Sequence, residues 1–383
     1  MQHLHVVCLE NPYPPNYGGA IEQHYKIQAF LKAQVPIVLH ILYSPQRPPA
    51  PQVYMKAQNV YFYPRNKSLR ALLGKQPFMV RSRKNSLLIK QLMQDTEPIL
   101  LEGIHTSAIL NEIKNIHPER KIFLRLHNHE ALYYQELAKN ETHILKKFYY
   151  FLEAIKLQFY EPYVLQKVDA IFAISTLEAQ WCKQYNPNTY WLPAFFYDSS
   201  NPIASIEQPI LYSNSSDFYI LYPANFAIPT NRAVAKYLIK SILPVLKPHQ
   251  KLILAGNSIP KNWLLLKHPQ LFCYSCPENM QDLIQKASII LLPGKQRAGI
   301  KIKFLESVLY HPLVAASSSL VKGSGLEPWS LTFENHKIRE FLENILNTPI
   351  EVWISKSRVL KEQLLKLYNP SKQVEFMLSI IGH

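Results

Sequence analysis

Short apolar runs alternate with longer segments of helical periodicity along the chain. In the first half, a helical pattern occupies Ile21–Ala33. The apolar runs around it, which we expect to be strands, are Leu4–Leu9, Ile37–Leu42, Pro98–Glu102, Ile122–Leu126 and Ala170–Ser175. This alternation is typical of strand–helix–strand units and of a parallel sheet.

The second half of the chain repeats the pattern. Its expected strands are Tyr219–Tyr222, Lys251–Ala255, Ile289–Pro293 and Leu313–Ala316. Its expected helices are Ala233–Val245, Met280–Ala287, Lys301–Leu309, Ile350–Leu367 and Pro370–Ile381. We therefore predict an α/β protein with two Rossmann-like, doubly wound parallel-sheet domains.

The length of 383 residues also fits two domains, each large enough for its own core. A stretch rich in Ser, Asn, Asp and Pro, with little periodicity, is typical of a linker. The predicted organisation is an N-terminal domain at 1–195, a linker at 196–217, a C-terminal domain at 218–365, and a final helix at 366–383. We expect that helix to pack back toward the N-terminal domain.

The charge balance indicates what the protein binds. Hydrophobic residues make up 48% and charged residues 18%, as in a well-packed globular protein, and the formal net charge is +15. Such a field attracts nucleic acid, phosphorylated small molecules or acidic lipid headgroups. No helix-turn-helix, zinc-finger or RNA-binding aromatic pattern is present, so we do not expect nucleic acid as a partner.

The first residues of the chain and its apolar runs indicate where the protein is located. The first residues lack the basic start, apolar core and cleavage site of a secretion signal, so we expect a cytoplasmic protein. No apolar run reaches the ~20 residues needed to cross a bilayer.

The cysteines are at positions 8, 182, 273 and 276, and the pattern around the last two is typical of a strand end followed by a turn. We predict no metal site and no cofactor.

Two stretches of the first half carry candidate chemistry. Gly18 and Gly19 stand between the first strand and a helix, where free amides can receive a phosphate or sugar oxygen, although a tight turn explains them equally. The stretch from Arg125 to Glu130 includes His127 and follows a strand, where ligands bind in parallel sheets. A helix cap is the alternative for Glu130.

The most informative segment runs from Leu291 to Ser307. A buried strand is followed by a basic, glycine-containing loop and then by a helix expected to begin near Gly299. The amides of Gly299 and Ile300, with Arg297 and a lysine, would form an anion site. Lys303 and Glu306 are three residues apart and share a helix face. Lys303 could bind a diphosphate, and the Glu306 carboxylate could accept hydrogen bonds from ribose hydroxyls. A surface ion pair between the two is the alternative.

Two further motifs have simpler interpretations. Ser175 and Glu178 form a Ser-x-x-Glu capping box, which we interpret as structural. The basic stretch that ends in Arg81, Arg83 and Lys84 is a candidate contact for an anionic acceptor or a lipid headgroup layer. A solvated loop is the alternative.

These blocks together resemble glycosyltransferases with two Rossmann-like domains facing across a cleft, the GT-B fold. The closest resemblance is to the large retaining family 4, or group 1, in its Gly-Ile-Lys-x-Lys subgroup. The matching blocks are Pro14–Gly19, Arg125–Glu130, Ile174–Glu178, Asn225–Arg232, Leu254–Gly256 and Gly299–Glu306, followed by His311–Ala315. Their order and spacing carry the resemblance, and no single block does.

The resemblance implies a transferase that moves a sugar from a nucleoside-diphosphate sugar to a hydroxyl of a glycan or lipid-linked glycan, with retention and without metal. It places the donor on the C-terminal domain and makes the N-terminal domain acceptor-side. The donor residues it implies are Gly18, Gly19, Arg297, Gly299, Ile300, Lys301, Lys303 and Glu306. The catalytic residues it implies are His127, Glu130 and Gly19. An anionic membrane surface is a further expected partner.

The sequence departs from the family pattern at two places. Ala298 stands where many members carry the first of two glutamates, and Tyr222 to Asn225 replace a strand end that often bears arginine. Lys303, Arg297 and Arg232 would then have to hold the diphosphate. Two alternative functions stay open: a nucleotide-sugar epimerase of the same fold, and a catalytically silent carbohydrate- or membrane-binding relative.

Overall fold

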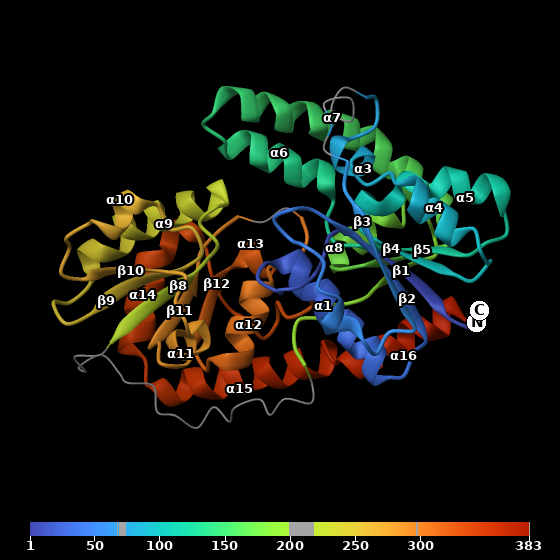
Figure 1. The fold of residues 1–383 in the computed structure, drawn as a ribbon. Coiled ribbons are helices and arrows are strands. Elements are labelled where there is room, and N and C mark those ends of the chain that lie inside the picture. Colours follow the sequence, from blue (N-terminus) through green and yellow to red (C-terminus); the bar gives the residue numbers. More distant parts are fainter. Residues whose placement is uncertain (67, 69–73, 199–217, 296–297, 383) are drawn as a thin grey trace. The chain divides into compact units, whose positions relative to one another are not determined.

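The computed structural model describes residues 1–66, 68, 74–198, 218–295 and 298–382 (Figure 1). The chain forms two compact units. The N-terminal unit comprises Met1–Asp198, Ala298–Ile300 and Tyr368–His383, and the C-terminal unit comprises Ser199–Arg297 and Lys301–Leu367. The expected linker at 196–217 lies mostly outside the described residues.

The N-terminal unit is built on a seven-stranded parallel sheet of order β3-β2-β1-β4-β5-β6-β7. Its strands are β1 (Leu4–Cys8), β2 (Ile37–Tyr43), β3 (Asn59–Pro64), β4 (Ile99–Glu102), β5 (Ile122–Leu126), β6 (Ala170–Ala173) and β7 (Thr189–Trp191). Its helices are α1 (Gly18–Lys32), α3 (Phe78–Arg81), α4 (Ser86–Leu92), α5 (Leu110–Ile116), α6 (Glu130–Asn140), α7 (Ile144–Lys167), α8 (Thr176–Cys182) and α16 (Pro370–Ile381), with short 3-10 helices at Pro51–Tyr54 and Ile104–Ile109.

Both faces of this sheet are covered, which is why its strands read as continuous apolar runs. Successive side chains of β1 point to opposite faces, so Val6 packs with Ile27 of α1 and Met377 of α16, whereas Val7 packs with Ile104 and Ile113 on the other side. Figure 1 shows α1 and α16 on one face of the sheet. A fully buried side chain of this size contributes roughly 1.5–3 kcal/mol.

The C-terminal unit carries a six-stranded parallel sheet of order β10-β9-β8-β11-β12-β13. Its strands are β8 (Tyr219–Pro223), β9 (Lys251–Gly256), β10 (Leu271–Ser275), β11 (Ile289–Leu292), β12 (Val314–Ser317) and β13 (Leu331–Phe333). Its helices are α9 (Pro229–Ile242), α10 (Lys261–Leu264), α11 (Met280–Gln285), α12 (Ile302–Tyr310), α13 (Ser318–Val321), α14 (Ile338–Asn347) and α15 (Ile350–Leu367), with 3-10 helices at Leu243–Val245 and Asn335–Lys337.

The two sheets share one topology, and it positions the candidate sites. In each sheet the chain starts in the middle, at β1 or β8, builds outward to one side, and then crosses to the other side at β4 or β11. Ligands of open α/β sheets bind beyond the carboxyl ends of the strands at such a switch point. The loops after β1, β4 and β5, and those after β8 and β11, are therefore the places to look.

The predicted α/β class with two doubly wound parallel sheets is confirmed, and every strand expected from an apolar run is present. Several boundaries differ from the prediction, and two of these differences bear on the candidate sites. The helix expected near Gly299 begins at Ile302, because Gly299 has φ +69° and Lys301 is the N-cap. The strand expected to reach Ser175 ends at Ala173, and Ser175 caps the next helix instead.

Candidate functional site

A buried network of charges lies beyond the carboxyl ends of β4 and β5. The Lys26 ammonium on α1 lies 2.9 Å from the Glu22 carboxylate and 2.7 Å from that of Glu102. Arg125 Nε donates to Glu22 across 2.8 Å, and His127 Nε2 lies 2.9 Å from the Glu102 carboxylate. Two carboxylates and two cations neutralise one another, which is what makes their burial tolerable. Burial opposes the charge of Glu22, but Lys26 and Arg125 hold its pKa low.

This network fixes the first predicted catalytic residue, His127. Glu102 engages Nε2 of the ring, so only Nδ1 is left for a ligand. Glu22, Glu102 and His127 also lie close enough together to be considered as metal ligands. The Lys26 ammonium already supplies the cation between the two carboxylates, so the residues do not fit an added ion.

The paired glycines are the first two residues of helix α1, whereas the sequence placed them just before the helix. Tyr17 is the N-cap and makes no side-chain capping bond, so among the described residues the amides of Gly18 and Gly19 have no partner. Gln23 ties the helix to the strand end, since its carbonyl accepts from Leu9 N at 3.1 Å and its amide donates to Gly19 O at 2.9 Å. The loop thus presents two amides at a helix N-terminus, where an anion is stabilised.

The second predicted catalytic residue, Glu130, is the first residue of α6 and is buried. Burial raises its pKa to about 8, so the side chain is protonated at neutral pH and can donate a hydrogen bond or a proton. It does not cap its helix, which was the alternative. Glu161 of α7 takes that role by accepting from Glu130 N at 2.8 Å and Ala131 N at 2.9 Å.

The capping box holds a further contact that the sequence did not reveal. Ser175 Oγ accepts from Leu177 N and Glu178 N, as predicted. Glu178 Oε1 accepts from Gly299 N at 2.6 Å, within the N-terminal unit. A Cβ on Gly299 would lie 1.9 Å from Asn128 Oδ1, so only glycine fits there. The prediction that the Gly299 amide binds a donor anion was wrong, because a glutamate of the chain already accepts from it.

The basic stretch in the first half differs from its prediction at one residue. Arg83 is buried and donates to the carbonyls of Leu9 and Met79, each across 2.6 Å. Burial lowers its pKa to about 9. It is therefore no headgroup contact, and the prediction was wrong for Arg83. Lys84 is exposed beside Glu112, and Arg81 is half-buried.

In the C-terminal unit, Lys303 lies on α12, which follows β11, and points to the end of β8. Its ammonium donates to Tyr222 Oη across 3.2 Å and lies 4.4 Å from the centre of that ring. Burial lowers the pKa of Lys303 to about 7, and Lys301 adds repulsion. Among the described residues it has no carboxylate partner, so its charge is poorly compensated.

Glu306 lies one turn further along α12 and is half-buried. Burial raises its pKa to about 7, and no other cause contributes. Within the described part of the chain it makes neither a hydrogen bond nor an ion pair, so the expected alternative of a Lys303–Glu306 pair is not found. The carboxylate is thus available to a ligand.

Side chains of the C-terminal unit fix the start of the loop between β11 and α12 by hydrogen bonds. The Gly294 carbonyl accepts from Ser317 Oγ at 2.7 Å, Ser319 Oγ at 2.9 Å and Asn335 Nδ2 at 2.9 Å. The first-turn amides of α12 are those of Ile302 and Lys303, and in the described chain neither has a partner. They take the place of the Gly299 amide in the candidate anion site, and the assignment of the Ile300 amide stays a prediction. Arg297 lies outside the described residues.

Arg232, a third candidate for the diphosphate, serves its own loop. One guanidinium nitrogen donates to the carbonyls of Phe226 and Ala227, at 2.7 and 2.9 Å. Arg232 therefore holds its own loop.

The Cys-x-x-Cys lies at the end of a strand, as predicted, because β10 ends at Ser275. Cys273 and Cys276 are not joined by a disulfide. No helix within the described ranges combines the length and apolarity needed to cross a membrane.

Comparison with known proteins agrees with this architecture. No protein-family model matches the chain. It is 25% identical over 347 residues to an uncharacterized 44.6 kDa protein in the cps region of Klebsiella pneumoniae, covering 85% of each. Among solved structures it is similar to the E. coli trehalose-6-phosphate enzyme bound with UDP-2-fluoro glucose, at TM-score 0.66 and 12% identity, covering 99% of this chain and 98% of that one.

A second similar structure is Anabaena Alr3699/HepE in complex with UDP and glucose, at TM-score 0.61 and 10% identity, covering 99% of this chain and all of that one. A third is an alpha-glucosyltransferase in complex with UDP, at TM-score 0.56 and 10% identity over the full length of both chains. At these identities the similarity establishes the fold. The chain has the two-domain, Rossmann-like GT-B fold.

Proposed function

We propose that this protein is a glycosyltransferase that takes a sugar from a nucleoside-diphosphate sugar and transfers it, with retention and without a metal ion, to a hydroxyl of a glycan or lipid-linked glycan. The observation that carries the proposal is the pair Lys303 and Glu306. Both are charged groups on the helix after the switch-point strand β11, and neither has an opposite charge beside it in the described chain.

The chemistry of a nucleoside diphosphate fits this pair. Lys303 and the amides of Ile302 and Lys303 itself stabilise the diphosphate, which is also the charge that develops as the leaving group departs. Glu306 accepts hydrogen bonds from the ribose hydroxyls. Three structures of this fold were solved with UDP or a UDP-sugar, so uridine is the first base to test.

The N-terminal unit would supply the transfer end of the reaction. The amides of Gly18 and Gly19, which have no partner among the described residues, suit sugar or phosphate oxygens. Glu102 contacts Nε2 of His127, so Nδ1 of that ring can contact a ligand. Glu130 is protonated at neutral pH and can donate a hydrogen bond to a hydroxyl. We assign these two residues to the sugar and the acceptor.

Product analysis tests the proposal against its two rivals. The purified protein is incubated with UDP-sugars, with and without a glycan or lipid-linked acceptor. Acceptor-dependent release of UDP, with the same anomeric configuration in product and donor, supports the transferase. Interconversion of free UDP-sugars without acceptor would make the protein an epimerase. Nucleotide binding without turnover would make it a silent relative.

Helix α7 supports the proposal that the acceptor is met at a membrane surface. Large apolar side chains recur along one stripe of the helix, and several are mostly exposed, with Ile144 at 80%, Leu145 at 74% and Phe159 at 75%. We call this stripe the α7 apolar face; its members are Ile144, Leu145, Phe148, Phe151, Leu152, Ile155 and Phe159. A contiguous exposed apolar face marks an interaction site.

The charges of the helix favour an anionic bilayer as the occupant. Lys146 and Lys147 are exposed in the first turn of the helix, outside the α7 apolar face, whereas Glu153 is buried and pairs with Lys156 at 3.0 Å. The exposed charges of the first half of α7 are therefore positive. Apolar residues that enter the lipid interface and lysines that meet anionic headgroups are the two components of interfacial helix binding.

Vesicle co-sedimentation tests the membrane contact. We expect binding to vesicles containing phosphatidylglycerol and little binding to pure phosphatidylcholine. The double variant Phe148→Ser/Phe151→Ser should lose it, whereas the control Leu87→Ser, which changes an exposed apolar residue of α4, should keep it. A dimer in sedimentation velocity that the double variant dissociates would instead assign the face to a second copy of the chain.

A further inference from the structure

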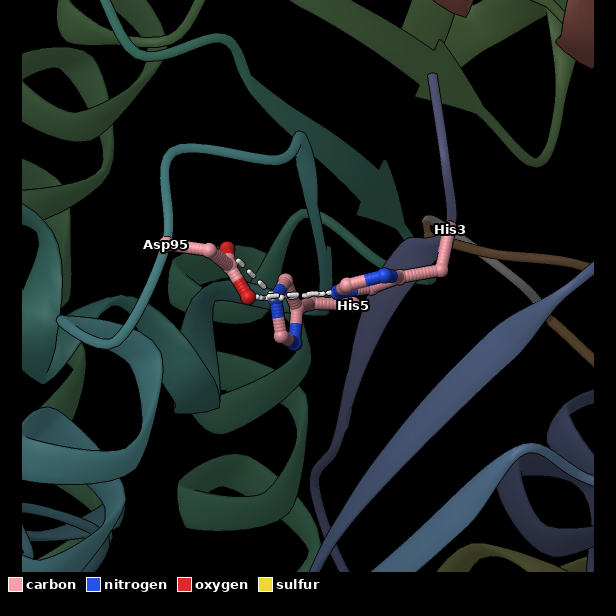
Figure 2. Close-up of side chains that lie close together, drawn as sticks. All are labelled: His3, His5 and Asp95. Atoms are coloured by element: carbon pink, nitrogen blue, oxygen red, sulfur yellow. Dashed lines mark hydrogen bonds and ion pairs between the residues drawn. The ribbon is translucent and has the colours of Figure 1, made fainter.

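A cluster of two histidines and an aspartate lies at the amino end of the N-terminal sheet (Figure 2). His5 is in β1, His3 precedes that strand by one residue, and Asp95 follows α4. Because side chains two apart in a strand point the same way, both rings lie on one face of the sheet. The candidate nucleotide and sugar residues lie beyond the carboxyl ends of the strands, so this cluster is separate from them.

The three side chains bring their ligand atoms to one point. His3 Nε2 and His5 Nε2 are 3.1 Å apart, His5 Nε2 is 3.1 Å from Asp95 Oδ2, and His3 Nε2 is 3.3 Å from the same oxygen. A zinc ion about 2.0–2.1 Å from each of its tetrahedral ligands holds them about 3.3 Å apart. The observed separations are close to that edge length, and Figure 2 shows both rings turned toward the carboxylate.

Residues behind the cluster set the orientation that ligation needs. His5 Nδ1 is 2.9 Å from His40 Nε2, and His40 Nδ1 is 3.0 Å from the Tyr63 hydroxyl. With the proton of His5 on Nδ1 and held by His40, its Nε2 presents a lone pair, as in metal-bound histidines. This chain of buried groups orients His5 from the interior of the unit.

The carboxylate is oriented in the same way. Arg120 Nη2 and the Glu97 amide each donate to Asp95 Oδ1, at 3.0 Å. Oδ2 is the oxygen nearer to His3, and among the described residues it contacts the two histidines. Hydrogen bonds to one oxygen of a ligating carboxylate fix the direction of the other.

We propose that His3, His5 and Asp95 form a zinc site that joins the start of β1 to the loop between α4 and β4. Two imidazoles and one carboxylate are ligand types that zinc prefers, and water supplies the fourth position. The site lies at the amino edge of the sheet, apart from the candidate donor and acceptor residues, so its expected effect is on the stability of the unit. The sequence predicted no metal because Asp95 is distant in the chain from His3 and His5, so no local spacing of ligands marks the cluster.

The test uses untagged, chelator-treated protein and zinc chloride. Calorimetric titration should show one zinc per chain, and zinc should raise the melting temperature of the protein. Cobalt(II) bound at the same site should give the strong visible bands of tetrahedral coordination. His3→Ala and Asp95→Asn should each weaken zinc binding by at least about tenfold.

The controls are His268→Ala, at an exposed residue, and Asp282→Asn, at a half-buried residue paired with Lys286; both lie elsewhere in the chain and should leave zinc binding unchanged. Failure of the wild type to bind zinc, or equal binding by His3→Ala, would overturn the proposal and leave a proton-linked histidine–aspartate network. His3→Ala should still bind UDP, so the result is independent of the proposed transferase activity.

Discussion

The two units treat charge in opposite ways beyond the carboxyl ends of their sheets. In the N-terminal unit, Glu22 and Glu102 are matched by Lys26 and Arg125, all fully buried and paired at 2.7–2.9 Å. In the C-terminal unit, Lys303 meets only a phenol among the described residues. The buried charges of the N-terminal unit are neutralised within the chain, whereas we expect a charged ligand to neutralise Lys303 in the C-terminal unit.

This difference follows from the cost of burying charge. A buried ion needs an opposite charge and hydrogen bonds, or its pKa shifts toward the neutral form. The pKa of Glu22 falls because its partners are present, whereas the pKa values of Lys303 and Glu306 move to about 7 because theirs are not. Perturbed groups of the second kind are characteristic of functional sites.

The largest effect is expected where the pairing is complete. Lys26→Met leaves two carboxylates buried without their ammonium, which should lower the free energy of unfolding of the N-terminal unit by about 3–5 kcal/mol. Chemical denaturation followed by fluorescence measures it. Lys32→Met is the control, because its pair with Asp198 is partly exposed and should be worth below about 1 kcal/mol. Equal effects of the two variants would refute the comparison.

A somewhat smaller effect is expected at Gly299. Alanine there must adopt φ +69° and place its Cβ against Asn128, so Gly299→Ala should destabilise the protein by about 1–3 kcal/mol. Gly294→Ala is the matched control, because its nearest neighbour, a Leu320 methyl, is at an ordinary 3.4 Å. A melting temperature of Gly299→Ala that matches the control would contradict the positive φ and the close approach to Asn128 at this position.

The unpaired groups predict how donor binding depends on pH. Lys303 is charged below its pKa of about 7, and Glu306 is charged above its own pKa of about 7. A donor that needs both charges should bind best near pH 7 and more weakly on either side. A UDP-sugar is the probe, because its diphosphate does not titrate in this range.

Single variants separate the two limbs of that profile. Lys303→Met should remove the alkaline limb and Glu306→Gln the acid limb, each with about ten- to a hundredfold weaker binding, as for hydrogen bonds to charged groups. Lys322→Met and Glu343→Gln, exposed residues of the same unit, serve as controls. An affinity that is flat from pH 6 to 8 in the wild type would contradict the assignment.

The smallest effect is expected from Tyr222→Phe. The change removes the hydroxyl that Lys303 meets and keeps the ring beneath the ammonium. A neutral hydrogen bond contributes about 0.5–1.5 kcal/mol, so donor affinity should change less than in Lys303→Met. A greater loss than in Lys303→Met, measured by the same titration, would make Tyr222 a direct donor contact.

The sequence predicted the sheets well because their strands are buried on both faces and read as apolar runs. It missed β3, in which only Tyr63 is buried, and also β7 and β13, which are three residues long and too short to show a pattern. It also missed α7, where apolar residues occupy both the buried and the exposed sides and Pro162 lies inside the helix. Periodicity is lost when a helix carries a second apolar face.

The candidate site was predictable only where its residues are close in sequence. Lys303 and Glu306 share one helix, and their spacing was enough to select them. The contacts of Glu178 with Gly299, and of His127 with Glu102, join residues far apart in the chain. No local pattern reports such pairs, so the role given to the Gly299 amide was wrong even though the glycine itself was correctly selected.

Calorimetric titration of UDP at pH 7 tests the central claim most directly, with the wild type compared with the variant Lys303→Met/Glu306→Gln. We predict one UDP per chain for the wild type and loss of measurable binding in the double variant, while its circular dichroism and the zinc titration stay unchanged. Equal UDP affinity in the two proteins would contradict the account, because the unpaired charges of α12 would then have no part in holding a nucleotide.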